Sequence, residues 1–292
     1  TTDAKDLVLR RKPPGKLLPS AHAVDREYKV MTALYETDVP VPRTYGLCED
    51  DDVAGTAFFV MDFLDGDLFW DPMIPSMTNK DRTEIYKNKN KTLAKLHSVD
   101  FKKIGLDDYG KPGNYVARQV SRWSKQYRSS ETDNIEAMNN LIEWLPNNIP
   151  DDDETSIVHG DYRLDNMILK NNEVIGILDW ELSTLGHPIA DFSYHCLSWR
   201  TQEAFWDEAR LKELGVPNEK EYMEMYCENT GKDLSKNWEF YMAYNMFKIA
   251  GILQGILGRV RDGTAENKHA EERGMIIYPL SEEAWKIIEE NL

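Results

Sequence analysis

The segment IVHGDYRLDNMILKNNEVIGILDWE, residues 157–181, constrains the fold of this chain more than any other. Acidic and amide side chains alternate in it with short apolar runs. The runs MILK and EVIGILDW flank Asn171-Asn172, and asparagine tolerates the positive φ angles that a tight turn requires. The sequence therefore predicts a β-hairpin that is anchored in the core and preceded by a polar loop, GDYRLDN.

Hairpin geometry should bring three of these polar side chains together. Antiparallel strands place the start and the end of a hairpin side by side, so Asn166 and Asp179 are expected to be neighbours, and Asp161 lies only five residues before Asn166. Oxygen ligands of this kind suit Mg²⁺, which takes one or two protein carboxylates and leaves room for phosphates. A carboxylate that binds no metal could accept a proton from a hydroxyl, as phosphoryl transfer requires. The alternative is a solvated acidic hairpin without a catalytic role.

The remaining patterns predict a small α/β region followed by a larger helical one. Residues 6–12 and 57–61 are typical of strands, and residues 21–36 of an amphipathic helix with Ser20 as its N-cap. Segment 39–50 reads as extended. Helical patterns cover residues 81–99, 117–127, 134–145, 218–231 and 237–260, and a short helix is expected from about Ser281. We therefore expect an α+β chain with a boundary near residues 62–66.

The net charge limits the classes of binding partner, and the cysteines indicate the cellular compartment. Lys and Arg total 35 against 51 Asp and Glu, a net charge of −16, which argues against duplex nucleic acid or an anionic membrane as a partner. A small anionic ligand needs only a local basic patch, such as LRRKPPGK at residues 9–16.

We find no apolar run of membrane-spanning length and no signal-peptide pattern. The three isolated cysteines, Cys48, Cys196 and Cys227, indicate a reducing, cytoplasmic environment. Nothing in the sequence predicts an oligomeric state.

The motif spacing resembles a known family. His159-Gly160-Asp161, then Asn166, then Asp179 after a hairpin, is similar to the kinase pattern of a catalytic Asp, an Asn five residues on and a metal-binding Asp. The form HGDYRLDN…ILDWE resembles the aminoglycoside phosphotransferase/choline kinase-like family. The segments LRRKPPGKLLPSAHAVDREY, RQVSRWSKQY and LDWELSTLGHP resemble more closely the phosphotransferase-like domain associated with acyl-CoA dehydrogenase-family proteins.

The resemblance implies a protein-kinase-like, two-lobed fold. Residues 1–64 would form a small, β-rich, nucleotide-binding lobe, and residues 65–292 a larger, mainly helical lobe that carries the catalytic hairpin and the substrate site. The Gly-rich loop of such kinases has no counterpart in this sequence. We expect that loop to be missing from these residues rather than from the protein.

The resemblance also implies roles for the polar residues of the hairpin. Asp161 would orient and deprotonate the acceptor hydroxyl, while Asn166 and Asp179 would hold Mg²⁺ on ATP. His159 would pack beneath the loop. Asp191, in HPIADFSYHC, would brace the loop as a structural carboxylate, the alternative being a metal site shared with nearby histidines.

The nucleotide would contact the first lobe. In the resembled pattern Glu27 pairs with a cation on the preceding strand, and adenine is bound by the backbone carbonyl of Asp62 and the backbone amide of Leu64. The usual lysine is replaced here by Arg10. Strand alternation places Val8 and Arg10 on one face, so Arg10 should point toward the nucleotide, where a guanidinium can clamp phosphate oxygens.

Four further side chains are expected to support the metal or the acceptor. Glu181 either faces the metal and the acceptor or pairs with an arginine such as Arg163. Trp123 and Tyr127 share one face of the predicted helix 117–127, where core packing is the alternative to lining the acceptor pocket.

These expectations combine into one leading hypothesis and two rivals. The chain would move the γ-phosphate of ATP to a hydroxyl of a small molecule, a hydroxylated acid or acyl thioester rather than an aminoglycoside. A nucleotide-binding regulatory pseudokinase without transfer activity is the first rival, supported by Arg10 and by the missing Gly-rich loop. A metal hydrolase built from the same acids is the second.

Overall fold

The N-terminal part is a three-stranded antiparallel sheet covered by one helix. The computed structural model describes residues 5–13, 23–201, 207–265 and 269–291. Strands β1 (Leu7–Arg11), β3 (Phe58–Asp62) and β2 (Thr44–Cys48) pair in that order, and α1 (Val24–Leu34) packs on β2 and β3. A short helix, α2 (Asp51–Ala54), connects β2 to β3. The expected order of strand, helix, strand and strand is confirmed, whereas the expected N-cap Ser20 lies outside the described residues.

The edge strand β1 shows the expected alternation. Val8 and Arg10 are half-buried, while Leu7 and Leu9 are 48% and 53% exposed. Arg10 pairs with Glu27 of α1, and side chains alternate along a strand, so the exposed Leu7 and Leu9 lie on the opposite face from α1. Arg10 therefore points inward, as the sequence predicted.

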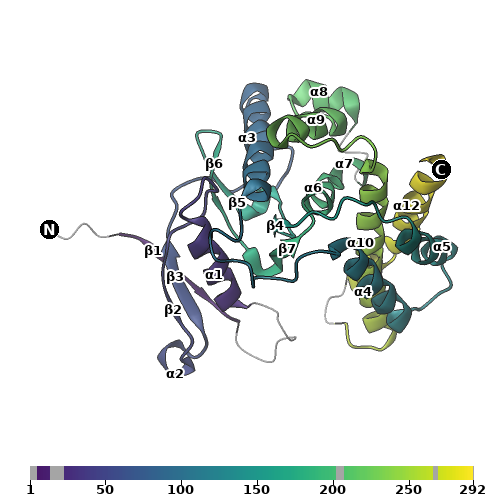
Figure 1. Cartoon of the computed structure of the whole chain (residues 1–292), viewed down its shortest axis with the longest axis horizontal. Coiled ribbons are helices and arrows are strands. Elements are labelled where there is room, and N and C mark those ends of the chain that lie inside the picture. Colours follow the sequence, from purple (N-terminus) through teal and green to yellow (C-terminus); the bar gives the residue numbers. More distant parts are fainter. Residues whose placement is uncertain (1–4, 14–22, 202–206, 266–268, 292) are drawn as a thin grey trace.

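The rest of the chain is mainly helical, and Figure 1 shows it on the opposite side of the molecule from the sheet. The helices are α3 (Asn79–Ser98), α4 (Tyr115–Ser130), α5 (Glu136–Trp144), α6 (Pro188–Cys196), α7 (Ser198–Thr201), α8 (Glu208–Leu214), α9 (Glu219–Thr230), α10 (Trp238–Arg261), α11 (Ala270–Gly274) and α12 (Ile277–Asn291). Helix α10 packs against α4, α6, α11 and α12 and forms the centre of this region. None of the helices in the described residues combines the length and the apolar character needed to cross a bilayer.

The last helix begins one turn earlier than the sequence suggested. It starts at Ile277 rather than near Ser281, with Pro279 in its first turn, where proline is tolerated. Ile277, Leu280 and Ala284 are all buried, so the apolar stripe runs through the proline.

The predicted hairpin is present between the two regions. Strands β5 (Met167–Lys170) and β6 (Glu173–Ile177) are antiparallel, and Asn171 and Asn172 have φ angles of 53° and 66°. Strands β4 (Ser156–Val158) and β7 (Thr184–Gly186) form a second two-stranded sheet. The backbone of Asp67 exchanges hydrogen bonds of 2.7 and 2.8 Å with Leu169 of β5, which ties the segment after β3 to the hairpin.

Candidate phosphotransfer site

The loop that precedes the hairpin is hydrogen-bonded to a buried carboxylate. Asp191 of α6 is 6% exposed and accepts hydrogen bonds from the backbone amides of His159 and Gly160, at 2.8 and 2.9 Å. His97 of α3 lies 3.2 Å from the same carboxylate. Burial alone would raise the pKa of Asp191, but these partners outweigh it and hold the pKa below its ordinary value. Asp191 thus braces the loop as expected.

His159 also supports the loop rather than facing solvent. Its ring is fully buried, with Nε2 3.0 Å from the carbonyl oxygen of Leu178 and Nδ1 accepting the amide of Asp161 at 3.2 Å. Burial lowers the pKa of His159, so the ring stays neutral at physiological pH. One imidazole therefore joins the end of β6 to the start of the loop.

The short 3-10 turn Leu164–Asn166 places Asn166 beside Asp161. The Asn166 side-chain amide donates to the Asp161 backbone carbonyl at 2.9 Å and to its carboxylate at 3.1 Å. The backbone carbonyl of Asn166 accepts the amide of Leu178 at 2.9 Å, just before Asp179. The start and the end of the hairpin are thus neighbours, as antiparallel pairing requires.

Asp179 faces the cation of the first strand. It has a left-handed backbone with φ of 60°, and its carboxylate lies 3.7 Å from the Arg10 guanidinium. Arg10 also forms a two-point pair with Glu27, at 3.0 and 3.3 Å. Burial raises the pKa of Glu27, although Arg10 opposes the shift. The expected pairing of Glu27 with the strand cation is present.

Arg163 and Glu181 were expected to support the metal or the acceptor. Arg163 contacts Asp161 at 3.3 Å and Asp165 at 2.8 Å. Glu181 is close enough to raise the pKa of both Arg10 and Glu27. Glu181 thus lies near Arg10 and Glu27, and both alternatives, facing the metal and the acceptor or pairing with an arginine, stay predictions.

The predicted hinge follows β3. The backbone amide of Asp62 donates to the Arg43 carbonyl at 2.9 Å, and its side chain accepts from the Tyr45 hydroxyl at 2.7 Å. No acceptor for the backbone amide of Leu64 is found among the described residues. The Leu64 side chain sits against Gly176 of β6, where any Cβ would collide with it. The amide of Leu64 is thus available at the junction of the two regions.

Helix α4 carries Trp123 and Tyr127, which were predicted to line the acceptor pocket or to pack in the core. Tyr127 is fully buried, and Trp123 is half-buried against Gly251 of α10. Neither lines the cavities described below, so the core-packing alternative describes Tyr127 better as it is placed here.

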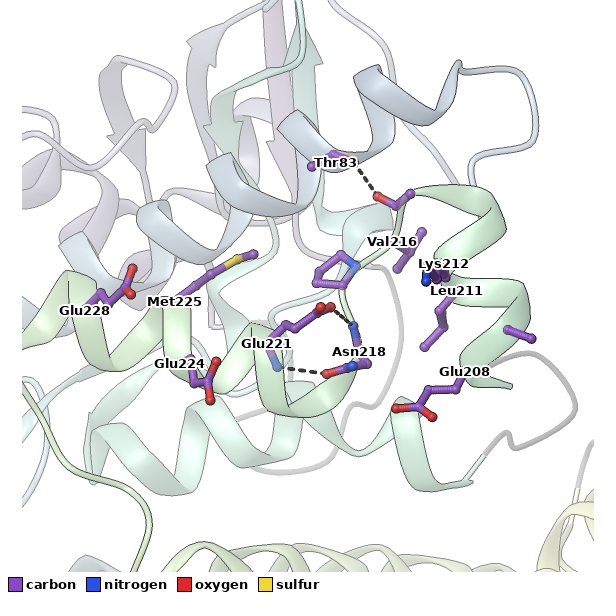
Figure 2. Close-up of a pocket in the computed structure, with 13 residues that line it drawn as sticks. Thr83, Glu208, Leu211, Lys212, Val216, Asn218, Glu221, Glu224, Met225 and Glu228 are labelled. Carbon is purple, nitrogen blue, oxygen red and sulfur yellow. Dashed lines mark hydrogen bonds between the residues drawn. The ribbon is translucent and has the colours of Figure 1, made fainter.

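Two cavities differ in their relation to this site. One of about 940 Å³ lies among α3, α8 and α9 and carries Glu208, Glu221, Glu224 and Glu228 (Figure 2). Its Glu221 forms a capping box with Asn218, and none of the predicted catalytic residues line it. A second cavity, of about 340 Å³, is lined by Arg163 and Asp165 of the loop itself. The second is therefore the one that adjoins the candidate site.

With the geometry in view, comparison with known proteins decides the family. A family model for the phosphotransferase enzyme family matches residues 1–226. The chain belongs to this family. The phosphotransferase is 44% identical over 288 residues to acyl-CoA dehydrogenase family member 10 of Mus musculus, covering 96% of this chain and 27% of that protein. It is 41% identical to acyl-CoA dehydrogenase family member 11 of Homo sapiens, covering 94% of this chain and 36% of that protein. The phosphotransferase thus spans about a third of these relatives.

Solved structures confirm the kinase-like fold of the phosphotransferase. The crystal structure of a Ralstonia eutropha protein assigned to the aminoglycoside phosphotransferases shares 46% identity, with a TM-score of 0.89 over 99% of this chain and 88% of that one. An ethanolamine kinase from Plasmodium vivax, at 14% identity, has a TM-score of 0.60 over 96% of this chain and 76% of its own. The second likeness concerns the fold alone.

Sequence reasoning missed one residue that borders the site. Lys89 of α3 is 4% exposed and lines the smaller cavity, although the tract KNKNK at residues 87–91 reads as a solvated face. The signal was present, because Lys89 lies four residues after Ile85 and four before Leu93, on the apolar stripe of the helix.

Proposed function

We propose that this phosphotransferase moves the γ-phosphate of ATP to a hydroxyl group of a small molecule. One chain of contacts supports the proposal: Asn166 donates to Asp161, the Asn166 carbonyl accepts the amide of Leu178 next to Asp179, and Asp179 lies 3.7 Å from Arg10, which pairs with Glu27. Residues 1–64 would bind the nucleotide through this pair and through the backbone of Asp62 and Leu64. Residues 65–292 would supply the catalytic groups.

The donor set fits a magnesium ion shared with phosphates. One carboxylate oxygen of Asp179 is buried without a hydrogen-bond partner, with Arg10 3.7 Å away, and no described residue donates to the side-chain oxygen of Asn166. The described residues contain no cluster of three or more His, Cys, Asp or Glu that could hold a metal alone. Asn166 and Asp179 would hold Mg²⁺, which takes its remaining ligands from phosphate and water. When bound, the ion would neutralise charge that develops on the transferred group.

The chain's own residues would position the reactants and accept one proton. The acceptor oxygen forms a bond to the γ-phosphorus, the bond from that phosphorus to the β,γ-bridging oxygen breaks, and ADP leaves. The hydroxyl proton passes to the Asp161 carboxylate, which Asn166 holds in place at 3.1 Å. Arg10 would bind phosphate oxygens while Glu27 fixes its guanidinium.

The names of the relatives support a proposal for the acceptor class. We propose a hydroxylated acid or acyl thioester, because the curated relatives of this chain are named as acyl-CoA dehydrogenase family members. Screening hydroxy acids, hydroxyacyl thioesters, sugars and aminoglycosides for acceptor-dependent ADP release tests this class. Release with aminoglycosides alone would contradict it.

Replacing Asp161 by Asn tests the transfer itself. With an acceptor from the screen, we expect Asp161→Asn to reduce turnover by about 10²–10⁴-fold, because a positioned base contributes rate gains of that order. Stabilisation of the protein by Mg²⁺-ATP should be unchanged, and the exposed Asp107→Asn serves as the control. Full turnover in Asp161→Asn would exclude Asp161 as the base. Stabilisation by Mg²⁺-ATP without ADP release for any acceptor would support the pseudokinase instead.

A further inference from the structure

The smaller cavity opens beside the catalytic loop and has a mixed lining. Arg163 and Asp165 form its loop side, and Lys89, Tyr194 and Ser198 contribute from α3, α6 and α7. Trp70, Leu197 and Ile249 add apolar surface, and Trp70 is 79% exposed. A volume of about 340 Å³ suits a small molecule.

Lys89 is the unusual member of this lining. Its side chain is almost fully buried, yet its ammonium group has no hydrogen bond or ion pair with any described residue. The nearest recorded partner is the ring of Tyr86 on the same helix, with Nζ 5.0 Å from the centroid. By contrast, the buried Arg82 of α3 donates to backbone carbonyls of Ile74, Met77 and Leu214.

The charges around Lys89 leave a net positive cavity. Asp165 is engaged by Arg163 at 2.8 Å. His195 and Cys196 of α6 are neutral at physiological pH, because burial lowers the pKa of the histidine and raises that of the thiol. Burial lowers the pKa of Lys89 to about 8, so most of the ammonium remains charged at neutral pH. Asp165 is close enough to oppose this shift, but no described residue forms an ion pair with the Lys89 ammonium, so an anion bound in the cavity would stabilise it.

One residue of the cavity lining contacts the proposed catalytic base. Arg163 lines the cavity and contacts the Asp161 carboxylate at 3.3 Å. A molecule bound in the cavity would therefore lie next to Arg163, the residue that contacts Asp161. The apolar part of the lining, formed by Trp70, Leu197 and Ile249, matches a short aliphatic chain.

We propose that this cavity is the acceptor subsite and that Lys89 binds a free carboxylate of the acceptor. The inference rests on the proposed function for the reacting end of the molecule and narrows its substrate class to hydroxy acids with an ionised carboxylate. Lys89 selects the acceptor, whereas Asp161 performs the proton transfer.

The test compares each hydroxy acid with its uncharged ester. The probes are straight-chain hydroxy acids from hydroxybutyrate to hydroxyoctanoate and the methyl ester of each. We expect Lys89→Met to raise KM for the preferred acid about tenfold or more, since a charged contact is lost, with KM for ATP unchanged. KM for the ester should not change, and Lys89→Arg should recover part of the loss.

Two further variants support this test: Lys87→Met is the control, and Ser198→Phe is the alternative if Lys89→Met does not fold. Lys87→Met removes an exposed lysine two residues away that contacts Glu84, and it should leave every constant unchanged. An unchanged KM in Lys89→Met, or a wild type that uses acid and ester equally, would overturn the assignment. If Lys89→Met does not fold, Ser198→Phe fills the same cavity, and unweakened binding of the acid would then overturn it.

Calorimetry without ATP separates this inference from the proposed function. Binding of the acid to wild type but not to Lys89→Met, with no ADP release, would retain the subsite and reject the transfer. Transfer to neutral and charged acceptors alike, unaffected by Lys89→Met, would retain the transfer and reject the subsite.

Discussion

Two regions next to the catalytic loop each contain a buried charged side chain: Asp191 lies beneath the loop, and Lys89 lines the cavity beside it. The two differ in their partners. Asp191 is buried, but two backbone amides and His97 lie at hydrogen-bonding distance from its carboxylate. Lys89 is buried to a similar extent, and no described residue pairs with its ammonium group. A satisfied buried charge adds rigidity to a structure, whereas an unsatisfied one costs stability. Asp191 therefore stabilises the fold of the loop. The unpaired ammonium of Lys89 lowers the stability of the free protein, and binding of an anionic ligand can offset this loss.

Replacing Asp191, the buried charge that has hydrogen-bond partners, should have the largest effect on the free energy of unfolding. We expect Asp191→Ala to lower the free energy of unfolding by about 3–5 kcal/mol, because it leaves buried donors without an acceptor. Urea denaturation measures this change, and the exposed Asp107→Ala should cost less than about 0.5 kcal/mol. A loss below about 1 kcal/mol for Asp191→Ala would remove the distinction between the two regions.

Replacing Lys89, the buried charge without a partner among the described residues, should change the free energy of unfolding in the opposite direction. We expect Lys89→Met to raise the free energy of unfolding at pH 7 by up to about 3 kcal/mol, from the difference between the ordinary pKa of 10.5 and the value of about 8. The unfolded chain binds more protons between these two values, so wild-type stability should rise from pH 8 to 10.5 and the gain of the variant should shrink. Urea denaturation across this range measures both effects. A less stable Lys89→Met at pH 7 would mean that the cation is satisfied.

The Arg10–Glu27 pair is an intermediate case, with one partner for a buried carboxylate. We expect Arg10→Met to cost about 1–3 kcal/mol at pH 8, because Glu27 is 2% exposed and loses its partner. The raised pKa of Glu27 lets it become neutral as pH falls, so the cost should be smaller at pH 5. Chemical denaturation at the two pH values measures the difference. An equal cost at both would show that Glu27 does not titrate in this window.

The smallest effect should come from the exposed neighbour of Lys89. Lys87 pairs with Glu84 at 3.0 Å, and both side chains are about half exposed. We expect Lys87→Met to change stability by less than about 0.5 kcal/mol, since exposed ion pairs contribute little. Parallel denaturation of Lys87→Met and Lys89→Met makes the comparison direct. Equal shifts in the two variants would show that burial is not the cause.

Local features of the fold were predictable because their determinants lie within a few residues. The Asn171-Asn172 turn needs two positive φ angles, and the structure has them. The alternation that directs Arg10 inward is a property of any half-buried strand. The start of the last helix was misplaced because a proline usually marks a boundary, whereas Pro279 lies within the first turn.

Features that depend on distant segments were less predictable. His97 and Asp191 are 94 residues apart in sequence, and their contact depends on how α3 and α6 pack. Lys89 lies on an apolar stripe, but that stripe also includes Arg82 and Asn90. Arg82 and Asn90 find backbone partners in other segments, and no described residue pairs with the ammonium of Lys89.

The sequence alone determined the hairpin, the neighbouring positions of its two ends, the pairing of Asp161 with Asn166, and the inward direction of Arg10. Turn chemistry and side-chain periodicity act over short stretches, so neighbouring residues suffice to specify them. The tertiary structure decided which charges are buried and which of these have partners. Burial and pairing depend on segments far apart in the chain, and only their packing determines whether a charge supports the fold or remains available to a ligand.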